Sequence, residues 1–285
     1  MSLPASIAAL DELTGRYRAI LCDVWGVVHN GVEIYPAAIA ALARARQRGL
    51  AVILITNAPR PHGSVEAQLD QLGVATEAYD RVVTSGDVTR DLIAEGPRDV
   101  FHIGSDRELT IYDGLDVSVA EESEARVVVC TGLYNDEVET PDDYAELLHR
   151  LRARDLPMIC ANPDIVVERG EKLIWCAGAL ARDYALLGGR TRIAGKPHRP
   201  IYQAALRAAG EVLGSELAPG QVLAIGDGIM TDVKGASDNG LEILYVSGGI
   251  HWRDYGETLD YDPPRLAAFL VKHGYKPVAV MPRLK

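Results

Sequence analysis

Two acidic residues each follow an apolar segment of this sequence. Asp23 comes directly after the apolar run 19–22, and Asp227 stands in a Gly-Asp-Gly sequence after the apolar run 222–225. Short apolar runs are typical of strands that are buried on both faces of a parallel sheet. Because ligands bind at the carboxyl ends of such strands, we expect both carboxylates at one binding edge. Carboxylate and carbonyl oxygens are the ligands that Mg²⁺ prefers, so the pair predicts a small metal site.

Two further segments carry groups that bind phosphate. The apolar run 51–55 ends in Thr56 and Asn57, where a hydroxyl and backbone amides can donate to phosphate oxygens; a turn stabilised by the hydroxyl is the structural alternative. Lys196 lies between Gly195 and Pro197, which indicates a non-helical loop. It would supply a cation for the phosphate and its transition state, although a single lysine is more often a solvated surface residue.

In these four motifs the chain resembles the haloacid dehalogenase (HAD) superfamily of aspartate-nucleophile phosphotransferases. With a long insertion between the second and third motifs, it looks like class IIA, the branch with a large α/β cap that includes p-nitrophenyl, phosphoglycolate and pyridoxal phosphatases. The resemblance runs from residue 20 to about 249. It implies that Asp23 is the nucleophile and forms an aspartyl phosphate, that Lys196 is catalytic, and that Asp23, Asp227 and the backbone carbonyl of Trp25 bind Mg²⁺.

Three other residues are less specific candidates. Asp232 lies five residues after Asp227 and either holds a metal-bound water or stabilises the N-terminus of a helix; we keep both interpretations and include it in the metal site. Asn162 and Asp164 lie in an insertion segment that resembles one facing the core site in the family. They are candidates for substrate binding, with a structural turn as the alternative. Substrate identity would be determined within 162–178, which departs from the family pattern.

Trp25 is the main departure from the family. The phosphatases carry Asp at this position, which protonates the leaving oxygen and later activates water, an effect of typically ~10² to 10⁴ in rate. An indole cannot do this, because its N–H does not ionise near neutral pH. Three explanations stay open: the leaving group needs no proton, a neighbour such as His29 supplies it, or the chain binds a phosphorylated ligand without turnover. Trp25 can also simply pack as a large residue.

Composition narrows the class of protein. The chain has 285 residues, enough for two domains, and a formal net charge of −11, which argues against nucleic acid as a partner. Local positive potential from a metal and Lys196 would have to attract an anionic substrate.

The four cysteines form no Cys-x-x-Cys pair and predict reduced thiols. No apolar segment is long enough to span a membrane and no signal peptide is recognised, so we expect a cytoplasmic protein without membrane contact.

Apolar runs and helix breakers predict alternating strands and helices. Helices are expected at about 36–48, 65–72, 87–94, 141–154 and 200–213. Strands are expected at about 50–55, 82–83, 99–103, 126–130, 158–161, 221–225 and 242–246. This pattern predicts an α/β fold, with a doubly wound, HAD-like parallel-sheet core at 1–84 and 191–285 and an inserted α/β cap at 85–190.

We therefore expect a Mg²⁺-dependent HAD-type phosphatase that acts on a small phosphorylated metabolite and is impaired for poor leaving groups. The alternative from another class is a catalytically silent sensor or scaffold that binds a phosphorylated ligand. A carbon–halogen hydrolase is disfavoured, because it would not need the metal acids Asp227 and Asp232. The sequence does not identify the substrate, and it leaves the oligomeric state open, with a homodimer as one option.

Overall fold

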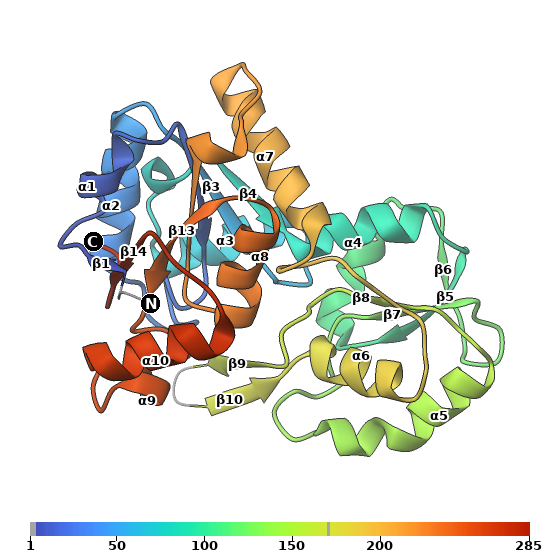
Figure 1. The fold of residues 1–285 in the computed structure, drawn as a ribbon. Helices are drawn as coiled ribbons and strands as arrows, with labels where there is room; N and C mark the ends of the chain where they lie inside the picture. Colours follow the sequence, from blue (N-terminus) through green and yellow to red (C-terminus); the bar gives the residue numbers. More distant parts are fainter. Residues whose placement is uncertain (1–3, 170–171) are drawn as a thin grey trace. The chain divides into compact units, whose positions relative to one another are not determined.

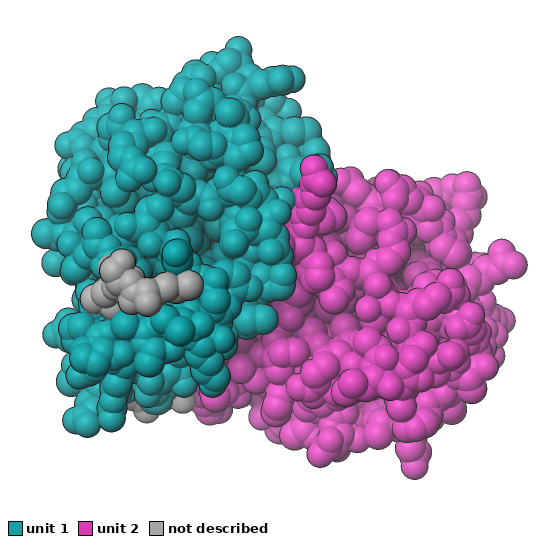
Figure 2. Space-filling model, viewed as in Figure 1, with its two compact units in different colours: residues 1–56, 66–83, 202–285 teal, residues 57–65, 84–201 magenta. Residues whose placement is uncertain are grey.

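The computed structural model describes residues 4–169 and 172–285 (Figure 1). The chain divides into two compact units, which Figure 2 distinguishes by colour. Unit 1 comprises residues 1–56, 66–83 and 202–285, and unit 2 comprises residues 57–65 and 84–201. Among the described residues, no helix is long and apolar enough to cross a membrane.

Unit 1 is built on a seven-stranded sheet. Its strands are β1 (Ala5–Ser6), β2 (Ala19–Asp23), β3 (Ala51–Thr56), β4 (Arg81–Thr84), β12 (Val222–Gly226), β13 (Glu242–Val246) and β14 (Ala279–Met281). Their order in the sheet is β1-β14-β13-β12-β2-β3-β4. From β2 the chain moves outward to β3 and β4 and then returns to β12 on the other side of β2. This is the doubly wound arrangement that the sequence predicted, and its switch point lies between β2 and β12.

Complete burial explains the continuous apolar runs of the central strands. Every residue of β2, β3 and β12 is buried. Helices flank this sheet: α1 (Asp11–Thr14), α2 (Pro36–Gln47), α3 (His62–Leu72), α7 (Arg199–Leu213), α8 (Lys234–Asp238), α9 (Trp252–Tyr255) and α10 (Pro263–His273). Helix α2 begins with Pro36, whose fixed φ suits a first turn, and the left-handed Gly49 follows its end. Of these helices, α3 and α7 each contain residues of both units.

Unit 2 has a five-stranded parallel sheet with the order β11-β8-β7-β5-β6. The strands are β5 (Asp99–Ile103), β6 (Ser118–Val119), β7 (Val127–Cys130), β8 (Met158–Cys160) and β11 (Thr191–Ile193). One apolar cluster joins this sheet to α5 (Ala145–Ala153) and α6 (Ala177–Leu186), and a second joins it to α4 (Ser85–Ala94) and the 3₁₀ helix η2 (Asp106–Tyr112). Helices and strands therefore form a second α/β layer structure with its own core.

Sequence reasoning missed several elements of unit 2. The predicted helix 141–154 consists of a 3₁₀ turn, η3 (Pro141–Tyr144), followed by α5. Within the segment 162–178, β9 (Val166–Arg169) and β10 (Lys172–Trp175) form an antiparallel hairpin, and residues 170–171 lie outside the described residues. Trp175 packs against the apolar core of unit 2. All four cysteines are free and buried, and their reduced state stays a prediction.

Candidate active site

Three buried carboxylates meet at the switch point of the unit 1 sheet. Asp23, Asp227 and Asp232 each offer one oxygen, and these oxygens all lie within 4.8 Å of one another. Strand register brings the first two together: Cys22 pairs with Ile225, so the residues that follow them emerge at the same sheet edge. The structure thus places together the three acids that the sequence proposed as metal ligands.

Backbone groups hold two of these acids in place. The Ile250 N–H donates to Oδ2 of Asp227 over 2.8 Å. The backbone also comes unusually close to this carboxylate, because a Cβ added at Gly26 or Gly249 would lie 2.2 or 2.0 Å from Asp227 Oδ2. Gly26 in addition has a φ of +86°, which side chains rarely adopt. Larger residues at these two glycines would therefore displace Asp227.

Asp232 fits both roles that the sequence left open. It lies in a short π-helical turn, η5 (Ile229–Val233), and its Oδ2 accepts the Gly228 N–H over 3.0 Å. It is therefore bonded to the start of that turn, as expected of an acid near a helix N-terminus. It also contributes an oxygen to the acidic cluster.

The acidic cluster fits a hard divalent cation. Three buried carboxylates at this separation repel one another strongly in a site of low dielectric. A cation such as Mg²⁺ or Ca²⁺ binds carboxylate oxygens and would offset that repulsion. The donor set contains oxygen only, which disfavours Zn²⁺ and other ions that prefer nitrogen or sulfur.

Trp25 packs within the turn that follows Asp23. Its ring lies edge-on to the ring of His29, with centroids 5.1 Å apart. On another side it touches Gly31, where an added Cβ would lie 2.5 Å from the indole. Arg283 holds the same turn from the C-terminal end of the chain, donating to the Gly26 carbonyl oxygen over 3.2 Å and stacking on Tyr35. These contacts agree with a packing role for the Trp25 side chain.

His29 is poorly suited to replace the missing acid. It is 2% exposed, and its Nδ1 accepts the Gly31 N–H over 2.8 Å, which fixes that nitrogen as an acceptor. Burial lowers the pKa of His29 to about 4. The imidazole is therefore neutral near pH 7. The sequence-based suggestion that His29 supplies the proton loses support from this geometry.

In unit 2, Asn57 holds the backbone of Lys196. Asn57 Oδ1 accepts the Lys196 N–H over 2.7 Å, and Asn57 Nδ2 donates to the Lys196 carbonyl oxygen over 3.2 Å. Nδ2 also donates to Oδ1 of Asp164 over 2.9 Å. Gly195 is required beside these groups, because a Cβ there would lie 2.4 Å from Asn57 Oδ1. Three of the predicted site residues thus form one hydrogen-bonded group, in which the Asn57 side chain has a positioning role that sequence reasoning missed.

The remaining predicted residues lie at element ends. Asn162 is buried, and its Oδ1 accepts the Asp164 N–H over 3.0 Å, so this segment contains the turn that was the structural alternative. Thr56 is buried at the end of β3. Because Asp23 pairs with Ile55 in the sheet, Thr56 lies one residue beyond the neighbour of Asp23. The assignment of these residues to phosphate or substrate stays a prediction.

Comparison with known proteins identifies the family. Residues 20–118 match the model of haloacid dehalogenase-like hydrolases, and residues 193–272 match a second model described as HAD-hydrolase-like. A solved haloacid dehalogenase-like hydrolase from Brucella suis is 62% identical, with 98% of this chain and 100% of that chain covered and a TM-score of 0.89. The chain belongs to the haloacid dehalogenase-like family. The resemblance inferred from the four motifs is therefore confirmed.

This HAD-like hydrolase is also similar to two proteins whose names state an activity. The 5′-nucleotidase YutF of Bacillus subtilis is 27% identical over 255 residues, which cover 87% of this chain and 93% of that protein. The p-nitrophenyl phosphatase of Archaeoglobus fulgidus is 22% identical and shares the fold, with a TM-score of 0.71 over 94% of this chain and 96% of that chain. At this identity the likeness shows the shared fold.

Proposed function

We propose that this HAD-like hydrolase is a Mg²⁺-dependent phosphatase that acts on a small phosphorylated metabolite through an aspartyl phosphate on Asp23. The observation that carries the proposal is the cluster of three buried carboxylate oxygens within 4.8 Å of one another at the switch point between β2 and β12. A relative named as a 5′-nucleotidase supports a phosphate ester as substrate. The net charge of −11 supports a small molecule rather than nucleic acid.

In the first step, a carboxylate oxygen of Asp23 would attack phosphorus, and the ester oxygen would leave with the electron pair of the broken P–O bond. A bound Mg²⁺ supplies charge neutralisation for the phosphate. Asp23, Asp227, Asp232 and the backbone carbonyl of Trp25 would hold that ion. The packed indole does not prevent residue 25 from binding the metal, because only its backbone carbonyl is needed.

The phosphate oxygens would bind to a second set of groups. Lys196 would supply the cation, with its backbone fixed by the side chain of Asn57. The Thr56 hydroxyl and the backbone amide of Asn57 would donate hydrogen bonds. Asn162 and Asp164 are proposed to contribute to substrate binding, and the first of them also shapes its own turn.

Proton transfer is the weak part of this chemistry. Neither the indole of Trp25 nor the neutral imidazole of His29 can protonate the departing oxygen at pH 7. In the second step, water must attack phosphorus to release phosphate and restore Asp23, and no base at residue 25 assists it. Esters whose leaving oxygen is already a weak base should therefore react best, such as aryl and acyl phosphates.

A panel of phosphate esters, assayed with and without Mg²⁺, tests the proposal. Release of phosphate from at least one aryl or acyl phosphate should require the ion and should disappear in Asp23→Asn. Absence of turnover for every ester, together with binding of phosphorylated ligands that Asp23→Asn leaves intact, would overturn catalysis. That result would favour the sensor, the function that the packed Trp25 side chain also permits.

A further inference from the structure

Unit 2 has a topological switch point of its own. In its sheet the chain moves from β5 outward to β6 and then returns to β7 on the other side of β5. Both neighbours are parallel to β5. In open α/β sheets, ligands bind outside the carboxyl ends of the two strands that flank such a point. In unit 1 the corresponding strands, β2 and β12, lead into Asp23 and Asp227.

Polar side chains converge at the carboxyl ends of β5 and β7. His102, Ser105 and Glu108 come from the end of β5 and the segment after it, and Thr131 directly follows β7. A Cβ added at Gly104 would lie 1.9 Å from Oγ1 of Thr131. The same position is 3.0 Å from Nε2 of His102 and 3.1 Å from Oε2 of Glu108. Gly104 has a φ of +154°, and it lets the chain pass between these groups.

Two of these side chains have a buried polar atom without a partner. His102 is 8% exposed, and its Nδ1 is hydrogen-bonded to the Tyr112 hydroxyl over 2.8 Å, but its Nε2 has no hydrogen-bond partner. The buried Oγ of Ser105 has none either. An unsatisfied buried polar atom costs about 1 to 3 kcal/mol, so two of them at the end of one strand indicate groups that a ligand would satisfy.

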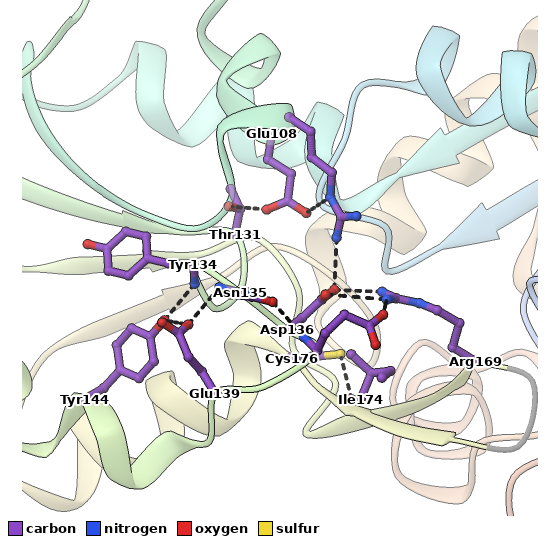
Figure 3. A network of polar contacts seen from close by, with 12 residues as sticks. Glu108, Thr131, Tyr134, Asn135, Asp136, Glu139, Tyr144, Arg169, Ile174 and Cys176 are labelled. Atoms are coloured by element: carbon purple, nitrogen blue, oxygen red, sulfur yellow. Dashed lines mark hydrogen bonds and ion pairs between the residues drawn. The ribbon is translucent and has the colours of Figure 1, made fainter.

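Glu108 adds a buried carboxylate to the same place. It is 8% exposed, and Thr131 Oγ1 donates to its Oε2 over 2.7 Å (Figure 3). Its other oxygen is 3.9 Å from Nε of Arg107, too far for a hydrogen bond. Burial raises the pKa of Glu108 above its usual range, because its partners do not compensate the loss of hydration. The carboxylate thus retains capacity to accept hydrogen bonds.

The charges nearby disfavour a phosphate or another polyanion. Arg107 and Arg169 both pair with the carboxylate of Asp136, over 2.9 and 2.7 Å (Figure 3). Arg169 also pairs with Glu137 over 2.9 Å. The guanidinium groups of Arg107 and Arg169 are therefore already matched by carboxylates. The charge of Arg60 also acts on Glu108. Three guanidinium groups thus stand against three carboxylates, those of Glu108, Asp136 and Glu137, which leaves no net positive charge for a polyanion. The groups that can form further hydrogen bonds are an imidazole nitrogen, a hydroxyl and a carboxylate. They complement the hydroxyls of a sugar, because each sugar hydroxyl both donates and accepts a hydrogen bond.

We propose that unit 2 binds a hydroxyl-rich small molecule of the pentose class at the carboxyl ends of β5 and β7. Glu108 accepts hydrogen bonds from two adjacent hydroxyls of this ligand, as strand-end acids do for ribose in dinucleotide-binding sheets. His102 Nε2 and Ser105 Oγ bond to further hydroxyl or ring oxygens. The pentose is either the organic part of the phosphorylated substrate or a separate effector. Only the first of these two sources rests on the proposed function.

Titration of the full-length protein with methyl β-D-ribofuranoside tests the site. The ¹⁵N NMR signal of His102 Nε2, assigned with His102→Gln, should shift saturably. The 2-deoxy analogue and the Glu108→Gln variant should each bind about tenfold more weakly, because each loses a hydrogen bond to a charged group. Ser105→Ala should also weaken binding, and it should fold normally because its hydroxyl has no partner to lose. Absence of a saturable shift in the wild type would overturn the proposal. Wild-type affinity in both Glu108→Gln and Ser105→Ala would also overturn it.

Tyr184→Phe is the matched control. It removes a buried hydroxyl of the same unit, which donates to the Leu156 carbonyl oxygen over 2.6 Å at the amino end of β8. This variant should be less stable than the wild type but should bind the riboside equally well. If it loses affinity as Glu108→Gln does, the effect of Glu108 is a general loss of structure and the site is refuted.

Inhibition kinetics then distinguish the two sources of the pentose. If the riboside competes with p-nitrophenyl phosphate, it occupies the place of the substrate's organic part. If it changes kcat without competing, it is an effector. Either pattern supports the site in unit 2 if Glu108→Gln weakens it, and a pattern that Glu108→Gln leaves unchanged counts against the site. A protein that hydrolyses no phosphate ester would refute the proposed function, while the His102 titration would still report on this site.

Discussion

The side chain of Asn57 binds both polar groups of the Lys196 backbone, accepting its N–H over 2.7 Å and donating to its carbonyl oxygen over 3.2 Å. These residues are 139 positions apart in the chain. Lys196 is 3% exposed, so its backbone has little freedom once these bonds form. The Asn57 side chain therefore determines where the loop that carries Lys196 lies in unit 2.

Asn57→Ala should lower kcat by about 10- to 100-fold if Lys196 binds the phosphate as proposed, because the cation would no longer be held in position. It should also destabilise the protein by about 2 kcal/mol, since two backbone groups lose their partner. Steady-state kinetics and urea unfolding measure the two effects. Asn239→Ala is the control, because the Asn239 side chain also bonds to a backbone carbonyl, that of Gly235. An unchanged kcat in Asn57→Ala would refute the positioning role.

Removal of the divalent cation should destabilise unit 1. Mg²⁺ at about 100 times its Kd should stabilise the fold by about 2.7 kcal/mol, because it binds the acidic cluster of the folded state only. In EDTA, Asp227→Asn should be more stable than the wild type, since it removes one of three buried negative charges. In Mg²⁺ the order should reverse. Thermal unfolding in both conditions measures this.

Asp238→Asn is the control for the cluster. Asp238 is exposed and pairs with Lys234 in α8, so its loss should not alter the response to Mg²⁺. If Asp227→Asn responds to Mg²⁺ as strongly as the wild type does, the cation binds elsewhere and the assignment of the cluster fails.

The stability of the protein should depend on the protonation of His29. Burial lowers the pKa of His29 to about 4 in the folded state, below its unfolded value of about 6.5. Between these values the unfolded chain binds more protons, so the contribution of His29 is complete above pH 6.5 and is lost as the pH falls toward 4. At pH 5 the loss should be about 2 kcal/mol.

Urea unfolding of the metal-free protein from pH 7.5 to 5 measures this effect. In His29→Asn the amide oxygen can accept the Gly31 N–H in place of Nδ1 without titrating. Its stability should therefore fall less than that of the wild type. Parallel pH curves for the two proteins would show that His29 does not titrate in this range.

The sequence predicted most of what positions the acidic cluster, because buried strands of a parallel sheet have a local signal. The runs before Asp23 and Asp227 are continuously apolar since both faces of β2 and β12 are covered. The hairpin β9–β10 was missed, because its strands have only four residues each and their pairing depends on contacts between them. The bonds from Asn57 to Lys196 could not be predicted either, since no local pattern reports a contact between residues so far apart.

Trp25 should make turnover depend on the leaving group of the ester. If nothing protonates the departing oxygen, rates should depend steeply on the acidity of the leaving alcohol, and alkyl phosphates should be poor substrates. A missing acid typically lowers the rate ~10² to 10⁴-fold, which equals about 3 to 5 kcal/mol of barrier. Hydrolysis of the aspartyl phosphate should also be slow, so phosphorylated Asp23 should accumulate in rapid-quench experiments. Kinetics with aryl, acyl and alkyl phosphates measure the dependence.

Trp25→Asp should raise turnover of alkyl phosphates more than that of aryl phosphates, because it restores an ionisable group where the indole now lies. The contacts of Trp25 with His29 and Gly31 make loss of the loop's structure the main competing effect. Trp25→Phe separates the two, since it keeps an aromatic ring but adds no acid. If Trp25→Phe and Trp25→Asp change alkyl turnover equally, the acid is not what the wild type lacks. Equal rates for alkyl and aryl esters in the wild type would show that another residue already supplies the proton.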